Sequence, residues 1–468
     1  MTLRMTLALT LLSVTPVLAQ PAAPSPAPPP VARKMPPPID STFETELDGL
    51  FTPGGLTADQ AAVRAIKVSP SVLRSAAEIE IAIAQAETAE LARIPRVAAS
   101  LGYTRLSYIE PFLFAPGTPG IEFLQNNMAG KAEVGVPISD YVLRFPKLIA
   151  AAKAGEEAAR VGRRSSEINA AQEARISYYE WVRAHLQVLV ARRQLAQVES
   201  TLGQIRALAE VQRVSRADLM RVESNQAQAE QAVAQLTQLV ALREEQLRLL
   251  IDVPDGPLTI GEDIRLDIAA PGAGDLGAQL DTARKQRLDF RALDTGIEAK
   301  EQLRAADKAS LYPRLQAFVN AEYSNPNPRV FPQEDKFTFT WAAGAQIAWT
   351  LNDALVHNST DRRLRGEVNT LRADRASLDR GARIQVLAAQ QAVTIAQSAL
   401  TTSQKGLAAA EEGYRVRREL LNAERATAVE LVDAETDLTR ARIAALNARV
   451  DLRVALTELA HALGDDAR

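Results

Sequence analysis

The most regular alternation of hydrophobic and polar positions lies between residues 337 and 350. Every second side chain there is aromatic, aliphatic or alanine, and the side chains between them are polar or small. A repeat of two predicts a β-strand with one apolar face. Segments 132–139 and 315–323 alternate in the same way, and segment 97–108 does so less regularly. The chain therefore contains four expected strands.

Strands of about ten residues with one apolar face and aromatic residues near their ends are typical of transmembrane β-barrels. A half-buried antiparallel sheet in a soluble domain has the same pattern, so the strands alone leave both structures open. In a barrel, we expect the two faces of segment 337–350 to meet lipid and lumen. The lipid-facing side chains would be Phe337, Phe339, Trp341, Ile347 and Trp349. The lumen-facing side chains would be Thr338, Thr340, Gln346 and Thr350.

A second pattern, with apolar residues every seven positions, fills much of the remaining chain. One series is Val386, Val393, Leu400, Leu407, Tyr414 and Leu421. Another is Leu431, Leu438, Ala445, Leu452 and Leu459, and residues 219–250 keep the same spacing. Small residues three places further on, such as Ala389 and Ala434, let helices approach closely. These features predict coiled coils.

Two of the helical patterns are too long for a compact domain. They run from about residue 146 to 211 and from about 355 to 421, which is near 66 residues or about 100 Å of α-helix each. Each is followed by a break and a second helical pattern, expected to return antiparallel to the first. We predict a long helical bundle with the strands at one end.

The order helix, strand pair, long helix, break and long helix occurs twice. Segment 215–223 corresponds to segment 427–435, and further matches occur where helices meet strands. Residues 1–19 have one early arginine and an apolar stretch, which predicts a secretory signal peptide. The expected division is a signal peptide (1–19), a proline-rich tether (20–55), a first repeat (56–251), a connector (252–275), a second repeat (276–463) and a C-terminal tail (464–468).

Composition and charge exclude several classes of function. Charged residues make up 24% of the chain, yet the formal net charge is −3, so nothing indicates nucleic-acid binding. The absence of cysteine excludes disulfides and a lipid-bearing N-terminal cysteine. The three histidines are far apart, and no phosphate-binding, dinucleotide-binding or GxSxG motif occurs. We therefore expect no metal, no cofactor and no catalytic residue.

A membrane location would require more than one copy of the chain. An open sheet edge in hydrocarbon leaves backbone groups unpaired at several kcal/mol each, so the sheet must close. The smallest membrane barrels have eight strands, whereas one chain supplies four. Three chains would supply twelve strands and leave room for an aqueous pore, although the sequence alone does not fix that number.

The doubled layout over residues 56–463 resembles the TolC-type outer-membrane efflux proteins. The segments that carry the resemblance are Pro95-Arg96, Pro313-Arg314, Ser215-Arg216-Ala217-Asp218-Leu219, Ala409-Ala410-Glu411-Glu412-Gly413-Tyr414 and Glu430-Leu431-Val432-Asp433-Ala434-Glu435. The resemblance implies a mainly α fold with a small transmembrane β part, in a homotrimer with a shared twelve-stranded barrel. It also implies an outer-membrane location, a helical tunnel in the periplasm, and no enzymatic activity.

The same resemblance implies partners: a periplasmic adaptor protein and an inner-membrane transporter, for which the trimer is the exit duct. The alternative is a periplasmic coiled-coil scaffold without a pore. The scaffold, however, gives no role to four alternating strands with Trp341 and Trp349 on the apolar face. Neither the transported substrate nor the class of pump can be derived from the residues.

Carried over from the family, the acidic constriction at the periplasmic tip falls on Glu430 and Asp433, with Asp218 in the first repeat. The residues expected to restrain the tip or contact an adaptor are Ser215, Arg216 and Arg425. Helix capping is an equal alternative, because Ser and Asp are common N-caps and the helix dipole favours carboxylates in a first turn.

The tip turns depart from the family pattern, which has glycine where this chain has Gln212 and Glu424. Asn422 is an alternative turn residue in the second repeat, because asparagine tolerates the left-handed conformation. At the other end of the strands, the proline-containing segments Ile109 to Gly130 and Asn325 to Asp335 are expected to be exposed loops.

Overall fold

The computed structural model describes residues 39–110, 124–254, 256–266, 268, 274–423 and 425–465. The expected signal peptide, the start of the tether, Glu424 and the last three residues of the tail lie outside the described residues. So does the middle of the first expected loop. The chain divides into two compact units, Met1–Thr45 and Glu46–Arg468. Helix α1 (Ile39–Leu50) includes residues on both sides of this boundary.

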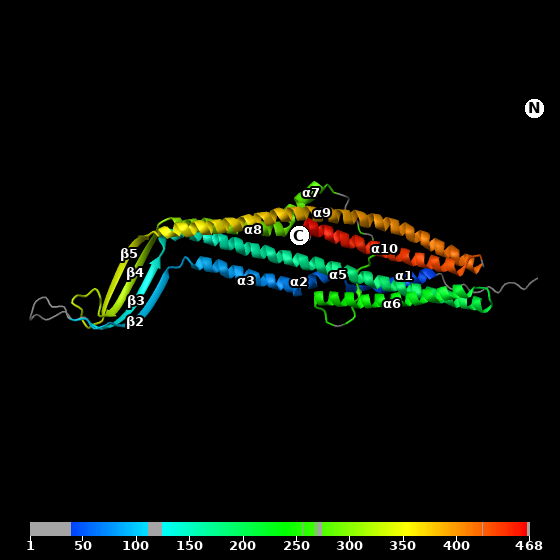
Figure 1. Ribbon diagram of the computed structural model, residues 1–468, viewed down its shortest axis with the longest axis horizontal. Helices are drawn as coiled ribbons and strands as arrows, with labels where there is room; N and C mark the ends of the chain where they lie inside the picture. The colour runs from blue at the N-terminus through cyan, green and yellow to red at the C-terminus, as the bar shows by residue number, and fades with distance from the viewer. Residues whose placement is uncertain are drawn as a thin grey trace, which may run out of the picture. The chain divides into compact units, whose positions relative to one another are not determined.

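The order of elements repeats within the second unit (Figure 1). After β1 (Phe51–Leu56), the first half contains α2 (Ala58–Val68), α3 (Pro70–Leu91), β2 (Arg96–Arg105), β3 (Asn126–Val136), α4 (Ile138–Leu143), α5 (Phe145–Glu210) and α6 (Arg216–Ile251). The second half contains α7 (Leu276–Gln286), α8 (Leu288–Asp307), the 3₁₀ helix η1 (Lys308–Leu311), β4 (Arg314–Asn325), β5 (Thr338–Ala348), α9 (Leu351–Asn422) and α10 (Ala428–Leu463). The predicted fold class, mainly helical with two structural repeats and a small β part, is confirmed.

Strands β2 to β5 form one antiparallel sheet in the order β2-β3-β4-β5, at one end of the long helices (Figure 1). The register places apolar side chains from all four strands on one face. Rows of partners on this face are Val97, Val134, Val319 and Ala343, and Ala99, Ala132, Ala321 and Trp341. The opposite face carries Lys131, Glu133, Gln316, Asn320, Glu322, Thr340 and Gln346. Strands β2 and β5 are the two free edges.

The start of β3 differs from the prediction. Residues 126–130 were expected in the first loop, as the end of the proline-containing segment Ile109 to Gly130. They extend β3 instead, since their partners from Leu101 to Arg105 in β2 continue the ladder beyond the regular alternation.

The two long helices are close to their predicted lengths. Helix α5 has 66 residues and α9 has 72, with α9 beginning at Leu351, four residues before the expected start. Each packs against the helix that follows it, α5 against α6 and α9 against α10. Between α9 and α10 the apolar core is built from small and branched side chains: Val386, Ala389, Val393, Ala396, Leu452, Ala455, Leu459 and Ala462. These are the positions of the predicted seven-residue series.

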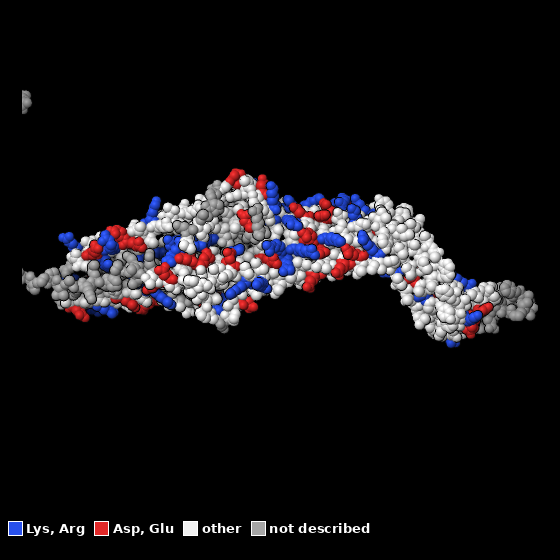
Figure 2. All heavy atoms as spheres, turned by 180° about the vertical axis from the view of Figure 1, so that it is seen from behind, with Lys and Arg blue, Asp and Glu red and all other residues white. Residues whose placement is uncertain are grey.

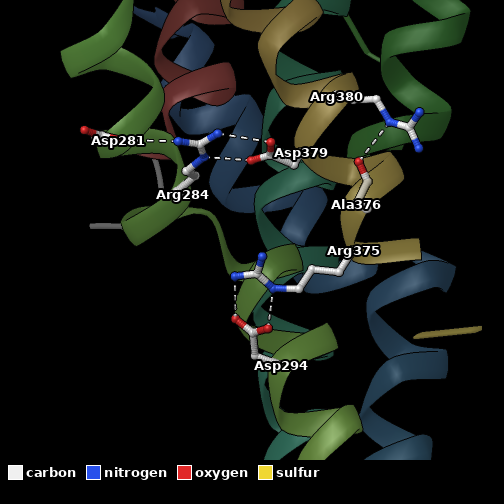
Figure 3. Close-up of polar contacts among 7 residues, drawn as sticks. All are labelled: Asp281, Arg284, Asp294, Arg375, Ala376, Asp379 and Arg380. Atoms are coloured by element: carbon white, nitrogen blue, oxygen red, sulfur yellow. Dashed lines mark hydrogen bonds and ion pairs between the residues drawn. The ribbon is translucent and has the colours of Figure 1, made fainter. Parts of the chain in front are cut away.

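Charged residues of both signs intermingle over the helical part and become sparse where the helices meet the sheet (Figure 2). A row of ion pairs joins α7 and α8 to the antiparallel α9, and part of it is drawn in Figure 3. The pairs are Arg284–Asp379 at 2.7 Å, Asp294–Arg375 at 2.5 Å, Glu301–Arg372 at 2.6 Å, Lys300–Glu367 at 2.8 Å and Arg304–Asp361 at 2.5 Å. Solvent-screened ion pairs of this kind add little to stability, so the row mainly fixes helix register.

The connector between the two halves is held by close backbone contacts and one buried ion pair. Gly261 N donates to Leu56 O at 2.8 Å, and a Cβ atom at Gly261 would lie 2.2 Å from the oxygen of Gly55. Glu262 accepts from Arg453 Nη1 of α10 at 2.7 Å and from the Tyr179 hydroxyl of α5 at 3.3 Å. Burial, assisted by the charge of Glu262, raises the pKa of Tyr179 to about 12. The connector is thereby tied to both halves of the bundle.

Among the described helices, none is long and apolar enough to cross a membrane.

Candidate functional site at the helical tip

The turns at the far end of the bundle have matching backbone geometry. Arg213 N donates to Leu208 O at 2.9 Å in the turn between α5 and α6. Arg425 N donates to Leu420 O at 2.8 Å in the turn between α9 and α10. The first turn passes through Gln212 at a φ of 58°, so glutamine adopts the left-handed conformation that usually favours glycine. Asn422 was considered as the turn residue of the second repeat, but it is the last residue of α9.

The tip residues Ser215 and Glu430 cap the returning helices. Ser215 Oγ accepts from Asp218 N at 3.1 Å and also lies 2.7 Å from Asp218 Oδ2. In the second repeat Thr427 and Glu430 form a capping box, with Glu430 N donating to Thr427 Oγ1 at 3.3 Å. Thr427 N donates to Glu430 Oε2 at 3.2 Å in return. The spacing Thr-x-x-Glu is readable in the sequence, so this capping role could have been predicted there.

Asp433 is free of such a capping role. Its side chain is 61% exposed, and its Oδ1 atom lies 3.4 Å from Nη2 of Arg221 on α6. In the part of the chain that the structure describes, neither Arg216 nor Arg425 pairs with Glu430, Asp433 or Asp218. The ion pair at the tip thus comes from Arg221, a residue that the sequence pattern did not single out.

A buried carboxylate lies just behind the exposed ones. Glu435, on α10, is 2% exposed. Thr201 Oγ1 of α5 donates to Glu435 Oε1 at 2.6 Å, while Glu435 Oε2 has no hydrogen-bond partner. Burial raises the pKa of Glu435 to about 7, and the hydrogen bond from Thr201 opposes the rise only in part. Its position four residues after Leu431 of the apolar series was the available signal in the sequence.

The predicted lipid-facing residues lie together at the opposite end of the unit. Phe339, Trp341 and Ile347 are on the apolar face of β5, and Phe337 and Trp349 flank the strand. All five side chains are exposed in the single chain. Phe337 stacks on Tyr323 of β4, with 5.2 Å between the ring centroids.

The chain was compared with protein-family models, with curated proteins and with solved structures. The model of the family described as outer membrane efflux protein matches residues 279–465. No curated protein matches the chain. The resemblance to the outer-membrane efflux proteins is confirmed.

Solved structures show the same fold over nearly the whole chain. The Campylobacter jejuni CmeC outer membrane channel is 13% identical, with a TM-score of 0.74 over 96% of this chain and 94% of that one. The open state of the Neisseria gonorrhoeae MtrE outer membrane channel is 18% identical, with a TM-score of 0.71 over 87% and 88%. The Vibrio cholerae outer membrane protein VceC is 15% identical, with a TM-score of 0.70 over 91% and 97%.

The family match over residues 279–465 and the shared fold support an outer-membrane efflux channel rather than an enzyme. The efflux channel lies in the outer membrane, and its long helices extend into the periplasm. The four strands belong to the membrane part, and the turns between the long helices lie at the other end of the bundle.

Proposed function

We propose that three copies of this chain form the exit duct of a tripartite system, with a periplasmic adaptor and an inner-membrane transporter as partners. The observation that carries the proposal is the open four-stranded sheet, whose apolar face crosses all four strands while β2 and β5 remain free edges. In hydrocarbon both edges must find partners. Three sheets of four strands close into a barrel wide enough for an aqueous pore.

Cysteine cross-linking tests the trimer, because the chain has no cysteine of its own. Ala99 on β2 is separated from β5 by two intervening strands of the same sheet, which is roughly 14 Å. A disulfide between these strands therefore cannot form within one chain. Ala99→Cys combined in turn with Ala343→Cys or Ala345→Cys, followed by oxidation in membranes, should give a covalent trimer on non-reducing gels.

The Ala99→Cys single variant is the control and should remain monomeric on the same gels. A largest covalent species of two chains would contradict the trimer. A complete lack of cross-links in all pairings would contradict closure of the sheet between chains.

We further propose that Asp433, Glu430 and Asp218 form acidic rings that constrict the tip. Threefold symmetry repeats each carboxylate around one axis, and a ring of like charge in a narrow aqueous opening favours cations. The exposure of Asp433 and its tie to Arg221 support this role. Glu430 has the capping role as well, because its carboxylate takes part in the capping box.

The two roles of Glu430 can be separated by substitution. Glu430→Gln keeps an acceptor for the capping box and removes the charge, and Asp433→Asn removes the second charge. Single-channel recordings of this double variant in planar bilayers should lose cation preference and block by multivalent cations. Asp437→Asn, an exposed change on the same helix, is the matched control. Unchanged selectivity in the double variant would leave only the capping role.

A further inference from the structure

A cavity of about 370 Å³ lies where the long helices meet the sheet. Its walls come from the start of α5, the end of α8, η1, the first residue of β4 and the first turns of α9. Figure 1 shows these elements converging at the base of the strands. Because the strands are the membrane part of an outer-membrane channel, the cavity lies at the periplasmic boundary of the bilayer.

Exposed aromatic side chains also lie where the helices meet the sheet. Tyr312 precedes β4, Trp349 follows β5, and Tyr141 lies in α4, and all three are exposed. Tyrosine and tryptophan collect at the depth of lipid headgroups, because their rings are apolar and their N–H or O–H groups need polar partners. On the face drawn in Figure 2, Lys, Arg, Asp and Glu become sparse where the helices meet the sheet.

The cavity carries both signs of charge. Lys300 and Arg363 of its lining pair with Glu367, whereas three other charged lining residues are weakly engaged. Arg314 and Asp353 line it, yet within the described residues neither side chain has an ion pair or a hydrogen bond. Arg144 also lines the cavity. Its ion pair with Asp140 is long and therefore weak, because 3.9 Å separate Arg144 Nη1 from Asp140 Oδ2. All three side chains are half-buried. Partly buried charges without a close partner are costly, which favours a ligand that brings complementary charges.

Two other lining residues, His357 and Asp307, contact each other. His357 is 7% exposed, and its Nδ1 atom lies 2.6 Å from Asp307 Oδ2. This contact joins the end of α8 to α9 within the lining of the cavity. Arg314 is the first residue of β4, and Arg144 lies between α4 and α5.

We propose that this cavity binds the headgroup of a phospholipid that carries both a phosphate and a primary ammonium group. The phosphate contacts Arg144 and Arg314, whose guanidinium groups donate in a planar fork suited to phosphate oxygens. The ammonium contacts Asp353. An anionic headgroup without an ammonium leaves Asp353 facing a like charge, so the mixed lining selects the zwitterion.

Native mass spectrometry of the full, assembled protein tests this site. The protein would be exchanged into mixed micelles with phosphatidylethanolamine, phosphatidylglycerol or phosphatidylcholine. The wild type should retain phosphatidylethanolamine most strongly. Arg314→Gln should lower that occupancy about fivefold, the effect of one interfacial arginine contact. Asp353→Asn should abolish the preference for phosphatidylethanolamine over phosphatidylglycerol.

Matched variants on the same helix separate a local effect from a change of net charge. Arg362→Gln and Asp374→Asn alter exposed residues of α9 that do not line the cavity, and both should bind lipid as the wild type does. Arg314→Lys, which keeps the charge and loses the planar fork, should bind the lipid more weakly than the wild type and more strongly than Arg314→Gln.

Two results would overturn the proposal. Equal retention of phosphatidylglycerol and phosphatidylethanolamine by the wild type would contradict selection of a zwitterion. Thermal stabilisation by soluble glycerophosphoethanolamine, without any retained phospholipid, would show a site for free phosphate compounds instead of a lipid headgroup.

Discussion

Glu435 is kept from water by three helices that meet just behind the tip. Thr201 and Gln197 approach it from α5, and Tyr414 faces it from α9. Burial raises its pKa from the ordinary value of 4.5 to about 7, so the folded protein binds this proton more tightly than the unfolded chain does. Its contribution to stability is therefore most favourable below about pH 4.5 and is lost as the pH rises towards 7.

Glu435→Gln should stabilise the protein at pH 8, because the neutral amide keeps the hydrogen bond from Thr201 without the cost of a buried charge. The gain should be at most on the order of 3 kcal/mol and should vanish near pH 4. Thermal unfolding from pH 4 to 8 would measure it. Asp437→Asn, which changes an exposed residue of the same helix, should not shift the profile. An equal gain at pH 4 and pH 8 would rule out proton binding as the cause.

The tip residues show how far single positions are predictable. Thr427 and Glu430 form their capping box through local spacing, which needs no tertiary information. Arg221 and Glu435 were missed because their roles depend on neighbouring helices. The seven-residue series places Glu435 beside the α9–α10 seam but does not show that α5 covers it.

The sheet shows what periodicity determines about an element. The alternation predicted the two faces of β5 correctly as an apolar and a polar row, and the ladder extends both rows over the other strands. The ends of the strands were less predictable. Residues 126–130 resemble a loop in composition, and only pairing with β2 makes them part of β3.

Arginine substitutions at adjacent residues of β5 test which face meets lipid. Phe339→Arg places a charge on the apolar face and should cost about 2 to 4 kcal/mol if that face lies near the bilayer midplane. Thr340→Arg, on the polar face, should be tolerated. The measurement is the yield of heat-modifiable oligomer in outer-membrane fractions. Equal assembly of the two variants would contradict the assignment of Phe339, Trp341 and Ile347 to lipid.

At the level of the whole molecule, the antiparallel order of the strands puts both strand-to-strand loops at the end of the sheet remote from the long helices (Figure 1). With the helices in the periplasm, these loops should lie at the cell surface. The two loops also touch, because Leu124 N donates to Gln333 Oε1 at 3.3 Å. Residues 111–123 of the first loop lie outside the described residues.

An epitope tag inserted after Glu334 should be reached by antibody on intact cells. The same tag after Gly256, in the connector, should be reached only after the outer membrane is permeabilised. Fluorescence labelling of whole and permeabilised cells would compare the two. A tag at Glu334 that needs permeabilisation would place the second loop on the periplasmic side and reverse the orientation of the sheet.

The sequence by itself determined the periodic features of this protein: the helical class, the long coiled-coil helices, the two-faced strands and the twofold order of elements. Repeats of two and seven residues decide which side chains share a face, so these features need no knowledge of neighbours. The tertiary structure alone decided the Arg221–Asp433 pair, the burial of Glu435 and the mixed-charge cavity beneath the sheet. Each joins residues far apart in the chain, as Thr201 and Glu435 are by 234 positions, and no local pattern records which of them meet.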